Sequence, residues 1–217
     1  MDRILSEYPE RVMPAHTAVV VVDMQNDFCA QGGYIDRKFG CDAADNEALA
    51  RTNMALVDAA RAAGAMVVWV RAIYDPKYLT APMLTRMQAP EAEVRCAEGS
   101  WGADFFMVEP AEGEFVVDKH RYSAFSGTGL DGILREHGIR TLVVTGVATN
   151  ICVDSTLRDG FNHGYYIVVP SDCVAAHNSE LHEATLKNVA FLLGDVTTAD
   201  DLIGLWQGSV AKLKKAG

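Results

Sequence analysis

A strand pattern that runs through a short turn into a helix pattern occupies residues 141–160, and it most constrains how this chain can fold. The apolar run Leu142-Val143-Val144 is typical of a parallel strand covered on both faces. Gly146 permits a sharp turn, and Thr149 or Asn150 can cap the helix that follows. A buried parallel strand joined to a helix predicts an α/β fold.

Cys152 falls in the first turn of that helix. Unpaired backbone N–H groups and the positive end of the helix dipole favour a thiolate there, and the same N–H groups can hold an oxyanion. The alternative is structural, because buried cysteines often serve as small hydrophobic side chains. A catalytic role requires an acid or base from elsewhere in the chain.

Strand and helix patterns alternate along the rest of the chain. Together with short connections and right-handed crossovers, this alternation predicts a parallel sheet between two helix layers. Residues 24–34 are expected to form a loop, and residues 71–113 a long excursion over the ligand-binding edge that helps to select the substrate. Strands are expected at 17–22, 66–70, 114–119, 141–144, 165–169 and 195–198. Helices are expected at 42–63, 83–88, 130–137, 180–193 and 199–214, and the helix that carries Cys152 is expected to run from its cap at 149 or 150 to about 162.

Two charged residues stand at the carboxyl ends of predicted strands. Asp23 ends the first strand, and Lys119 ends the third. Ligands bind at this edge of parallel sheets, and Cys152 approaches the same edge. Taken singly, Asp23 can be a turn former and Lys119 a solvated charge. Three such groups on one edge favour a functional site.

Composition limits the classes of partner and compartment. With 49% hydrophobic residues and a mean hydropathy of +0.05, the chain is expected to form a single domain over residues 1–217, with residues 1–16 as an N-terminal arm. A net charge of −10 argues against nucleic acid and anionic membranes as partners. Five cysteines without zinc-ligand spacing, and no signal-like or membrane-spanning run, predict a reduced cytoplasmic location.

Glycines at 127, 129 and 132 match the dinucleotide-binding pattern G-x-G-x-x-G. A nucleotide-binding module is therefore an alternative from another functional class. Eight residues, 119–126, lie between Asp118 and the first of these glycines, whereas the fingerprint needs the glycines directly after a strand. A turn before the helix at 130–137 explains them better.

Three segments resemble the motifs of the isochorismatase-like cysteine hydrolases. They are Val-Val-Val-Val-Asp-Met-Gln-Asn-Asp-Phe at 19–28, Asp-Lys-x-Arg-Tyr-Ser-x-Phe at 118–125, and Val-Thr-Gly-Val-Ala-Thr-Asn-Ile-Cys-Val-Asp-Ser-Thr-Leu-Arg-Asp-Gly at 144–160. The similarity extends from about residue 17 to 198. It implies a three-layer α/β/α sandwich with a six-stranded, mostly parallel sheet, and a non-proline cis peptide between Val147 and Ala148.

The resemblance also implies residue roles. Cys152 would be the nucleophile, Asp23 the group that takes and returns its proton, and Lys119 the cation that holds both. The backbone N–H groups of Ala148 and Cys152 would bind the oxyanion. The implied reaction is attack on an amide or ureide carbonyl through a covalent Cys152 acyl intermediate, with release of ammonia or an amine. No metal and no cofactor is implied.

Departures from the family's motifs narrow the substrate. True isochorismatases lack the nucleophilic cysteine, and the family's nicotinamidases carry metal-binding histidines after the second strand, where residues 71–75 have none. Segments at 32–36, 121–123 and 155–161 look most similar to ureidoacrylate amidohydrolases, and biuret, triuret and N-carbamoylsarcosine hydrolases share the framework. A ureido or carbamoyl substrate is expected, with a nicotinamidase or another small-amide hydrolase as the alternative. The expected substrate-binding residues are Phe28, Tyr34, Arg121 and Tyr122.

Three questions remain open at the level of sequence. Arg121 or Lys77 can bind a carboxylate, if the substrate has one. The family implies a homodimer or homotetramer. A catalytically silent interaction protein with this fold would carry a Cys152 thiol no more reactive than free cysteine.

Overall fold

Parallel strands with nearly continuous burial form the centre of the fold. The computed structural model describes residues 3–40, 43–87 and 94–216. In these ranges a seven-stranded sheet has the order β3-β2-β1-β4-β5-β7, and the short β6 pairs with β4. Every one of these strand pairs is parallel. The strands are β1 (Thr17–Val22), β2 (Met66–Ala72), β3 (Phe115–Lys119), β4 (Thr141–Val147), β5 (Tyr166–Pro170), β6 (Val174–Ala175) and β7 (Gly194–Thr197).

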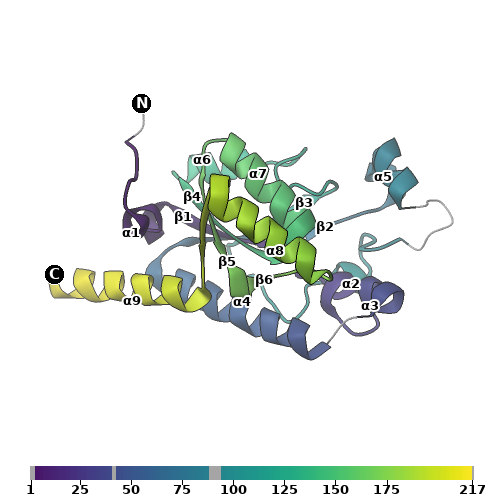
Figure 1. Ribbon diagram of the computed structural model, residues 1–217, viewed down its shortest axis with the longest axis horizontal. Helices are drawn as coiled ribbons and strands as arrows, with labels where there is room; N and C mark the ends of the chain where they lie inside the picture. The colour runs from purple at the N-terminus through teal and green to yellow at the C-terminus, as the bar shows by residue number, and fades with distance from the viewer. Residues whose placement is uncertain (1–2, 41–42, 88–93, 217) are drawn as a thin grey trace.

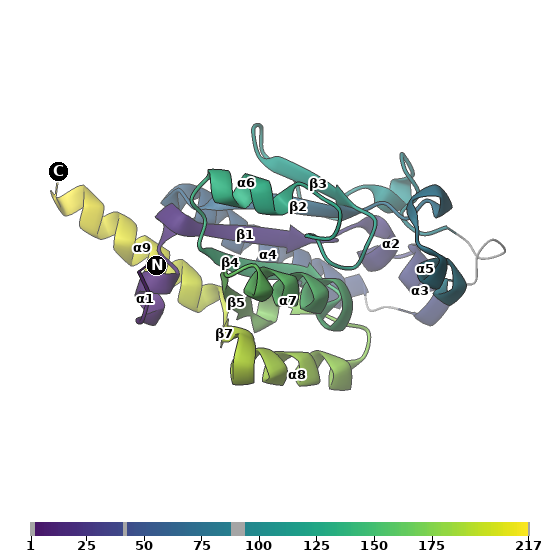
Figure 2. The ribbon, with the colours of Figure 1, turned by 90° about the horizontal axis from the view of Figure 1, so that it is seen from above.

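Helices cover both faces of this sheet (Figures 1 and 2). One core cluster joins α4 and α9 to alternate sheet residues such as Val19 and Trp69, and a second joins α6, α7 and α8 to residues of the opposite face such as Val20 and Val68. The helices are α1 (Tyr8–Arg11), α2 (Asn26–Cys29), α3 (Tyr34–Phe39), α4 (Ala43–Ala63), α5 (Ala81–Arg86), α6 (Leu130–Glu136), α7 (Asp154–Asn162), α8 (Ser179–Asn188) and α9 (Ala199–Ala216). The predicted α/β/α sandwich is confirmed.

The contact between β1 and β4 brings the sheet's two central strands unusually close. Val22 pairs with Gly146, whose φ is 99°. A Cβ atom at this glycine would lie 2.0 Å from the Val22 carbonyl oxygen. Gly146 therefore serves the close approach of two strands, and the turn itself comes later, after Val147.

Several predicted elements differ from the observed ones. The sheet has a seventh strand, β6, which is only two residues long and joins β4 beyond the point where β5 stops pairing. Residues 24–34, predicted as a loop, contain α2 and the start of α3. The helix predicted at 180–193 ends at Asn188, and a π-helical turn covers Val189–Leu193. The predicted helix ends Asp42 and Gln88 lie outside the described residues.

The excursion between β2 and β3 lies beyond the carboxyl end of β1. In Figure 2 the arrowhead of β1 points toward α2, α3 and α5. Gly127 and Gly129 form a turn before α6, as expected, with Gly127 at a φ of 74°. No helix in the described part of the chain is long and apolar enough to cross a bilayer.

Candidate active site

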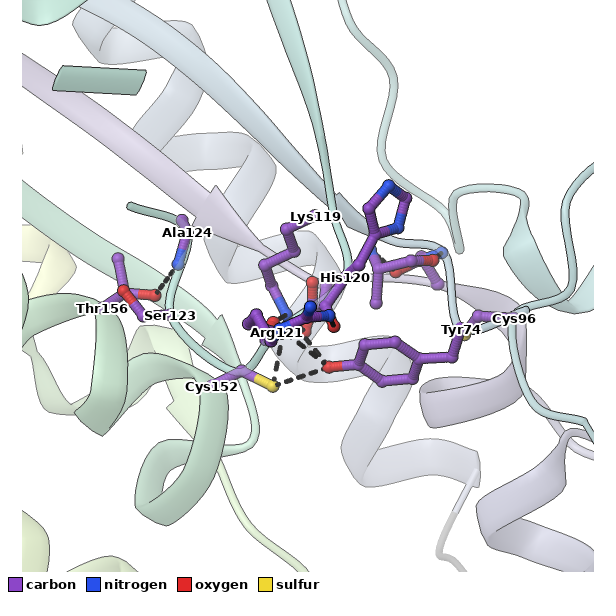
Figure 3. Close-up of polar contacts among 12 residues, drawn as sticks. Tyr74, Cys96, Lys119, His120, Arg121, Ser123, Ala124, Cys152 and Thr156 are labelled. Carbon is purple, nitrogen blue, oxygen red and sulfur yellow. Dashed lines mark hydrogen bonds and ion pairs between the residues drawn. The ribbon is translucent and has the colours of Figure 1, made fainter. Parts of the chain in front are cut away.

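The side chains of Asp23, Lys119 and Cys152 meet at the carboxyl edge of the sheet. The Lys119 Nζ lies 2.8 Å from Asp23 Oδ2 and donates a hydrogen bond to Cys152 Sγ at 3.4 Å. The Asp23 and Lys119 side chains are 1% and 0% exposed, so this ion pair is sealed from solvent. Figure 3 shows Lys119 directed toward the sulfur of Cys152. The strand-end positions thus bring the three predicted groups into contact.

Each of the three groups is held by a different strand end. Lys119 is the last residue of β3, and Asp23 follows β1. Asp23 has a φ of 53°, and its N–H donates to the Val70 carbonyl on β2 at 2.9 Å. Aspartate is one of the few residues besides glycine that adopt this left-handed conformation. Residues held in it concentrate at functional sites.

Cys152 belongs to a π-helical turn between β4 and α7. This turn spans Thr149–Val153 and follows a cis peptide bond between Val147 and Ala148, as the resemblance implies. The Ala148 carbonyl accepts N–H bonds from Ile151 at 2.9 Å and Val153 at 3.2 Å. The turn is therefore fixed by its own backbone.

The cap expected for this helix is absent. Neither Thr149 nor Asn150 is an N-cap. Ala148 is the N-cap of the π turn and Val153 that of α7, and neither makes a side-chain cap bond. The Thr149 hydroxyl is buried and lies 2.9 Å from Nδ1 of His182 on α8. The side chain that was expected to cap α7 instead joins the π turn to a neighbouring helix.

Tyr74 is a fourth member of the cluster that the sequence patterns did not indicate. Its hydroxyl lies 3.7 Å from Cys152 Sγ and accepts a hydrogen bond from Lys119 Nζ at 3.3 Å. Lys119 also donates to the Arg121 carbonyl at 3.0 Å. Tyr74 comes two residues after β2, so the strand-end rule that identified Asp23 and Lys119 also applies to it.

Burial dominates the electrostatics of the nucleophile. It raises the pKa of Cys152 to about 12, although the Lys119 charge opposes this shift. The expectation that the helix terminus favours a thiolate is therefore wrong for the free protein, where the sulfur stays a thiol. Deprotonation requires a neighbouring base.

Asp23 is suited to be that base. Burial raises its pKa above the ordinary value even though the Lys119 charge and bonds from Lys119 and Cys152 lower it. Burial also lowers the pKa of Lys119, but the charges of Asp23 and Cys152 outweigh this, so the pKa rises overall. A carboxylate with a raised pKa is a stronger base, and Lys119 remains a permanent cation beside it.

The predicted substrate-binding residues differ in their surroundings. The Tyr34 ring is buried, and the Arg95 guanidinium lies over this ring and over the ring of Tyr74. Phe28 and Tyr122 are half-buried and pack against the core clusters. One terminal nitrogen of the Arg121 guanidinium donates to the carbonyls of Tyr78 and His120, both at 2.7 Å.

Metal-binding side chains do not gather at the end of the second strand. Among the described residues there is no group of three or more histidine, cysteine, aspartate or glutamate side chains that could hold an ion. The positions after β2 are occupied by Ile73 and Tyr74, which are both buried.

Comparisons with known proteins identify the family. Residues 17–201 match the family model described as the isochorismatase domain. This chain belongs to the isochorismatase family. As a member, it is a hydrolase. It is similar to the ureidoacrylate amidohydrolases of Methylobacterium radiotolerans, at 37% identity over 99% of this chain and 90% of the relative, and of Methylorubrum extorquens, at 40% identity over 83% and 79%.

Solved structures of other hydrolases share the fold. A cysteine hydrolase from Pseudomonas syringae pv. phaseolicola superposes with a TM-score of 0.80 at 28% identity, covering 96% of this chain and 99% of that one. An N-carbamoylsarcosine amidase from Thermoplasma acidophilum has a TM-score of 0.68 at 28% identity, covering 85% and 96%. The predicted membership of the isochorismatase-like hydrolases is confirmed.

Proposed function

We propose that this chain is a cysteine-dependent amidohydrolase that cleaves a C–N bond of a small ureido or carbamoyl compound. The observation that carries the proposal is the buried contact of Asp23, Lys119 and Cys152 at one sheet edge. A carboxylate, an ammonium and a thiol in contact supply the base, the cation and the nucleophile that acyl transfer requires. Sequence similarity to ureidoacrylate amidohydrolases along almost the whole chain supports the substrate class.

The first step is formation of a thiolate as it attacks. Asp23 takes the proton from Cys152, and the sulfur adds to the carbonyl carbon of the substrate. Lys119, 3.4 Å from the sulfur, stabilises the negative charge while the proton is away. The Tyr74 hydroxyl, 3.7 Å from the sulfur, has a pKa raised well above its ordinary value, chiefly by burial, so it stays protonated and donates to the thiolate.

The next steps break the C–N bond and release the acyl group. We assign the backbone N–H groups of Ala148 and Cys152 to the oxyanion that forms on the substrate. Protonated Asp23 gives its proton to the leaving nitrogen, which departs as ammonia or an amine. Water, deprotonated by Asp23, then cleaves the Cys152 thioester-type bond. For a ureide, the product is a carbamic acid, whose breakdown gives carbon dioxide and the second amine or ammonia.

The test is ammonia release from a panel of candidate substrates. Ureidoacrylate, biuret, triuret, N-carbamoylsarcosine and nicotinamide would be compared at equal concentration, and a ureide should have the highest kcat/KM. Cys152→Ala and Asp23→Asn should each lower this rate by at least about 10³-fold. Cys173→Ala, at a buried cysteine of the opposite core cluster, is the matched control and should retain the rate.

Two results would contradict the proposal. Turnover that survives in Cys152→Ala would show that the reaction does not pass through a covalent Cys152 intermediate. A wild-type preference for nicotinamide over every ureide would assign the enzyme to another substrate class.

A further inference from the structure

Arg95 is a charged residue beside the site that the proposed reaction does not use. Its guanidinium carbon lies 5.6 Å from the ring centre of Tyr34 and 5.3 Å from that of Tyr74. The same Tyr74 ring lies 5.4 Å from Lys119 Nζ, and its hydroxyl reaches the Cys152 sulfur. The length of one tyrosine side chain therefore separates the Arg95 guanidinium from the Cys152 sulfur. A small molecule can span the same distance.

This guanidinium has no anionic partner among the described residues. Within the described part of the chain, no carboxylate lies within 4.0 Å of it, and its buried Nε atom has no hydrogen-bond partner. A partly buried cation without a partner is costly, so such groups are normally paired or bind an anion. Stacking on two aromatic rings holds the guanidinium in place without using its five N–H donors.

The other charges near Arg95 are already engaged. Asp23 pairs with Lys119. Asp27 accepts backbone N–H bonds from Tyr34 at 3.0 Å and from Cys96 at 2.6 Å. Lys38 donates to the Tyr34 hydroxyl at 3.0 Å. Among these groups of the described residues, Arg95 is the one whose buried Nε has no hydrogen-bond partner.

The backbone next to Arg95 is fixed on two sides. The Cys96 N–H donates to Asp27 Oδ2, and the Cys96 carbonyl accepts the Tyr74 N–H at 3.1 Å. Gly102 packs so tightly on the Asp27 carboxylate that a Cβ there would lie 2.1 Å from Oδ2. Arg95 therefore belongs to a segment anchored to the residues that follow Asp23, rather than to a freely moving loop.

From this geometry we infer that Arg95 binds a carboxylate of the substrate and makes the enzyme select ureido acids over neutral ureides. The inference rests on the proposed function, because it assumes a ureide carbonyl at Cys152. A guanidinium matches a carboxylate with two parallel N–H bonds, which fixes both orientation and distance. The two other cations considered from the sequence are occupied, since Arg121 binds two carbonyls and Lys77 pairs with Glu98 at 2.9 Å.

The test compares an acid with its neutral counterpart. Wild type, Arg95→Gln and Arg95→Lys would be assayed with 3-ureidopropionate or ureidoacrylate and with the methyl ester of the same acid. Arg95→Gln should lower kcat/KM for the acid by about 10- to 150-fold, mainly through KM, because it removes hydrogen bonds to a charged group. The ester should change by less than about threefold. Arg95→Lys keeps the positive charge but not the two parallel N–H donors of the guanidinium, and should give an intermediate loss of kcat/KM for the acid.

Two further measurements make the result decisive. Arg86→Gln, at an exposed arginine of α5 in the same excursion, is the matched control and should match wild type on both substrates. Calorimetry with the inactive Cys152→Ala protein should show binding of the acid that is lost in Cys152→Ala/Arg95→Gln.

The outcomes separate this inference from the proposed function. Equal losses on acid and ester, an unchanged acid rate in Arg95→Gln, or wild-type preference for the ester would overturn the role of Arg95 while leaving the amidohydrolase intact. Absence of ureide turnover in wild type would overturn the proposed function. In that case calorimetry still decides the role of Arg95, because equal binding by both inactive proteins, or none by either, would contradict it.

Discussion

Removing one partner of the buried Asp23–Lys119 pair should destabilise the protein with a pH dependence that identifies which charge is left. In Asp23→Asn, Lys119 keeps its complete burial but loses its ion pair. The response that costs the least free energy is for Lys119 to lose its proton. At pH 7 this costs at most about 4.6 kcal/mol, because about 3.4 pH units separate pH 7 from the ordinary lysine pKa, at about 1.36 kcal/mol per unit.

The Lys119→Met variant should show the opposite pH dependence of stability. In Lys119→Met, Asp23 takes up a proton, and about 3.1 pH units separate its ordinary pKa from pH 7, which caps the cost near 4.2 kcal/mol. The folded Asp23→Asn protein binds fewer protons than its unfolded chain, so its stability relative to wild type rises with pH. Folded Lys119→Met binds more protons than its unfolded chain, so its relative stability falls with pH. Each slope approaches about 1.36 kcal/mol per pH unit.

Urea unfolding of wild type, both single variants and the double variant at about pH 5, 7 and 9 measures these terms. The double variant Asp23→Asn/Lys119→Met removes both charges, so it should recover most of the stability without recovering turnover. The reasoning is refuted if both single variants show the same pH slope as wild type. It is equally refuted if the two losses simply add in the double variant.

Three further predictions follow from the site and the sheet. Gly146→Ala should lower the free energy of unfolding by roughly 2–6 kcal/mol, because its Cβ would meet the Val22 carbonyl oxygen and its φ is left-handed. The control Gly132→Ala has open space around it and should change this free energy by less than about 1 kcal/mol. Urea unfolding of both variants measures the difference. Tyr74→Phe should lower kcat about tenfold with little change in Tm, and an unchanged kcat would remove its hydroxyl from the mechanism. Because Asp23 must be ionised to act as base, kcat/KM should fall on acidification through a pKa above the ordinary aspartate value, which a flat pH profile down to about pH 4 would contradict.

The part of the site that follows from strand ends was predictable from sequence. Asp23 and Lys119 each end a strand pattern, and parallel strands deliver such residues to one edge whatever the loops do. Tyr74 obeys the same rule, since it follows the end of β2 by two residues. No motif in the sequence marks a phenol at this place, so the strand end is the signal that points to it.

Arg95 and the thiol pKa could not be predicted in this way. The position of Arg95 depends on a bond between the Cys96 N–H and Asp27, 69 residues away in sequence, and no local pattern reports it. The pKa of Cys152 depends on the balance between a helix terminus and burial, and burial is a property of the packed site. In the proposed mechanism the thiolate forms only when Asp23 accepts the proton. An unreactive Cys152 thiol in the free protein would therefore not distinguish a silent protein from an enzyme.

Three polar residues at positions 25–27 determine how the segment between β2 and β3 can be exchanged. The Gln25 side chain donates to the Ala103 carbonyl at 2.8 Å, Asn26 donates to the Trp101 carbonyl at 2.8 Å, and Asp27 accepts the Cys96 N–H. All three side chains bond to main-chain atoms, which nearly every amino acid supplies. A segment of different sequence grafted between Tyr74 and β3 must present two carbonyls and one amide N–H at these places, and it must keep a glycine at position 102, where a Cβ would meet the Asp27 carboxylate. Within these conditions the side chains of the segment can vary while the contacts among Asp23, Lys119 and Cys152 stay as they are.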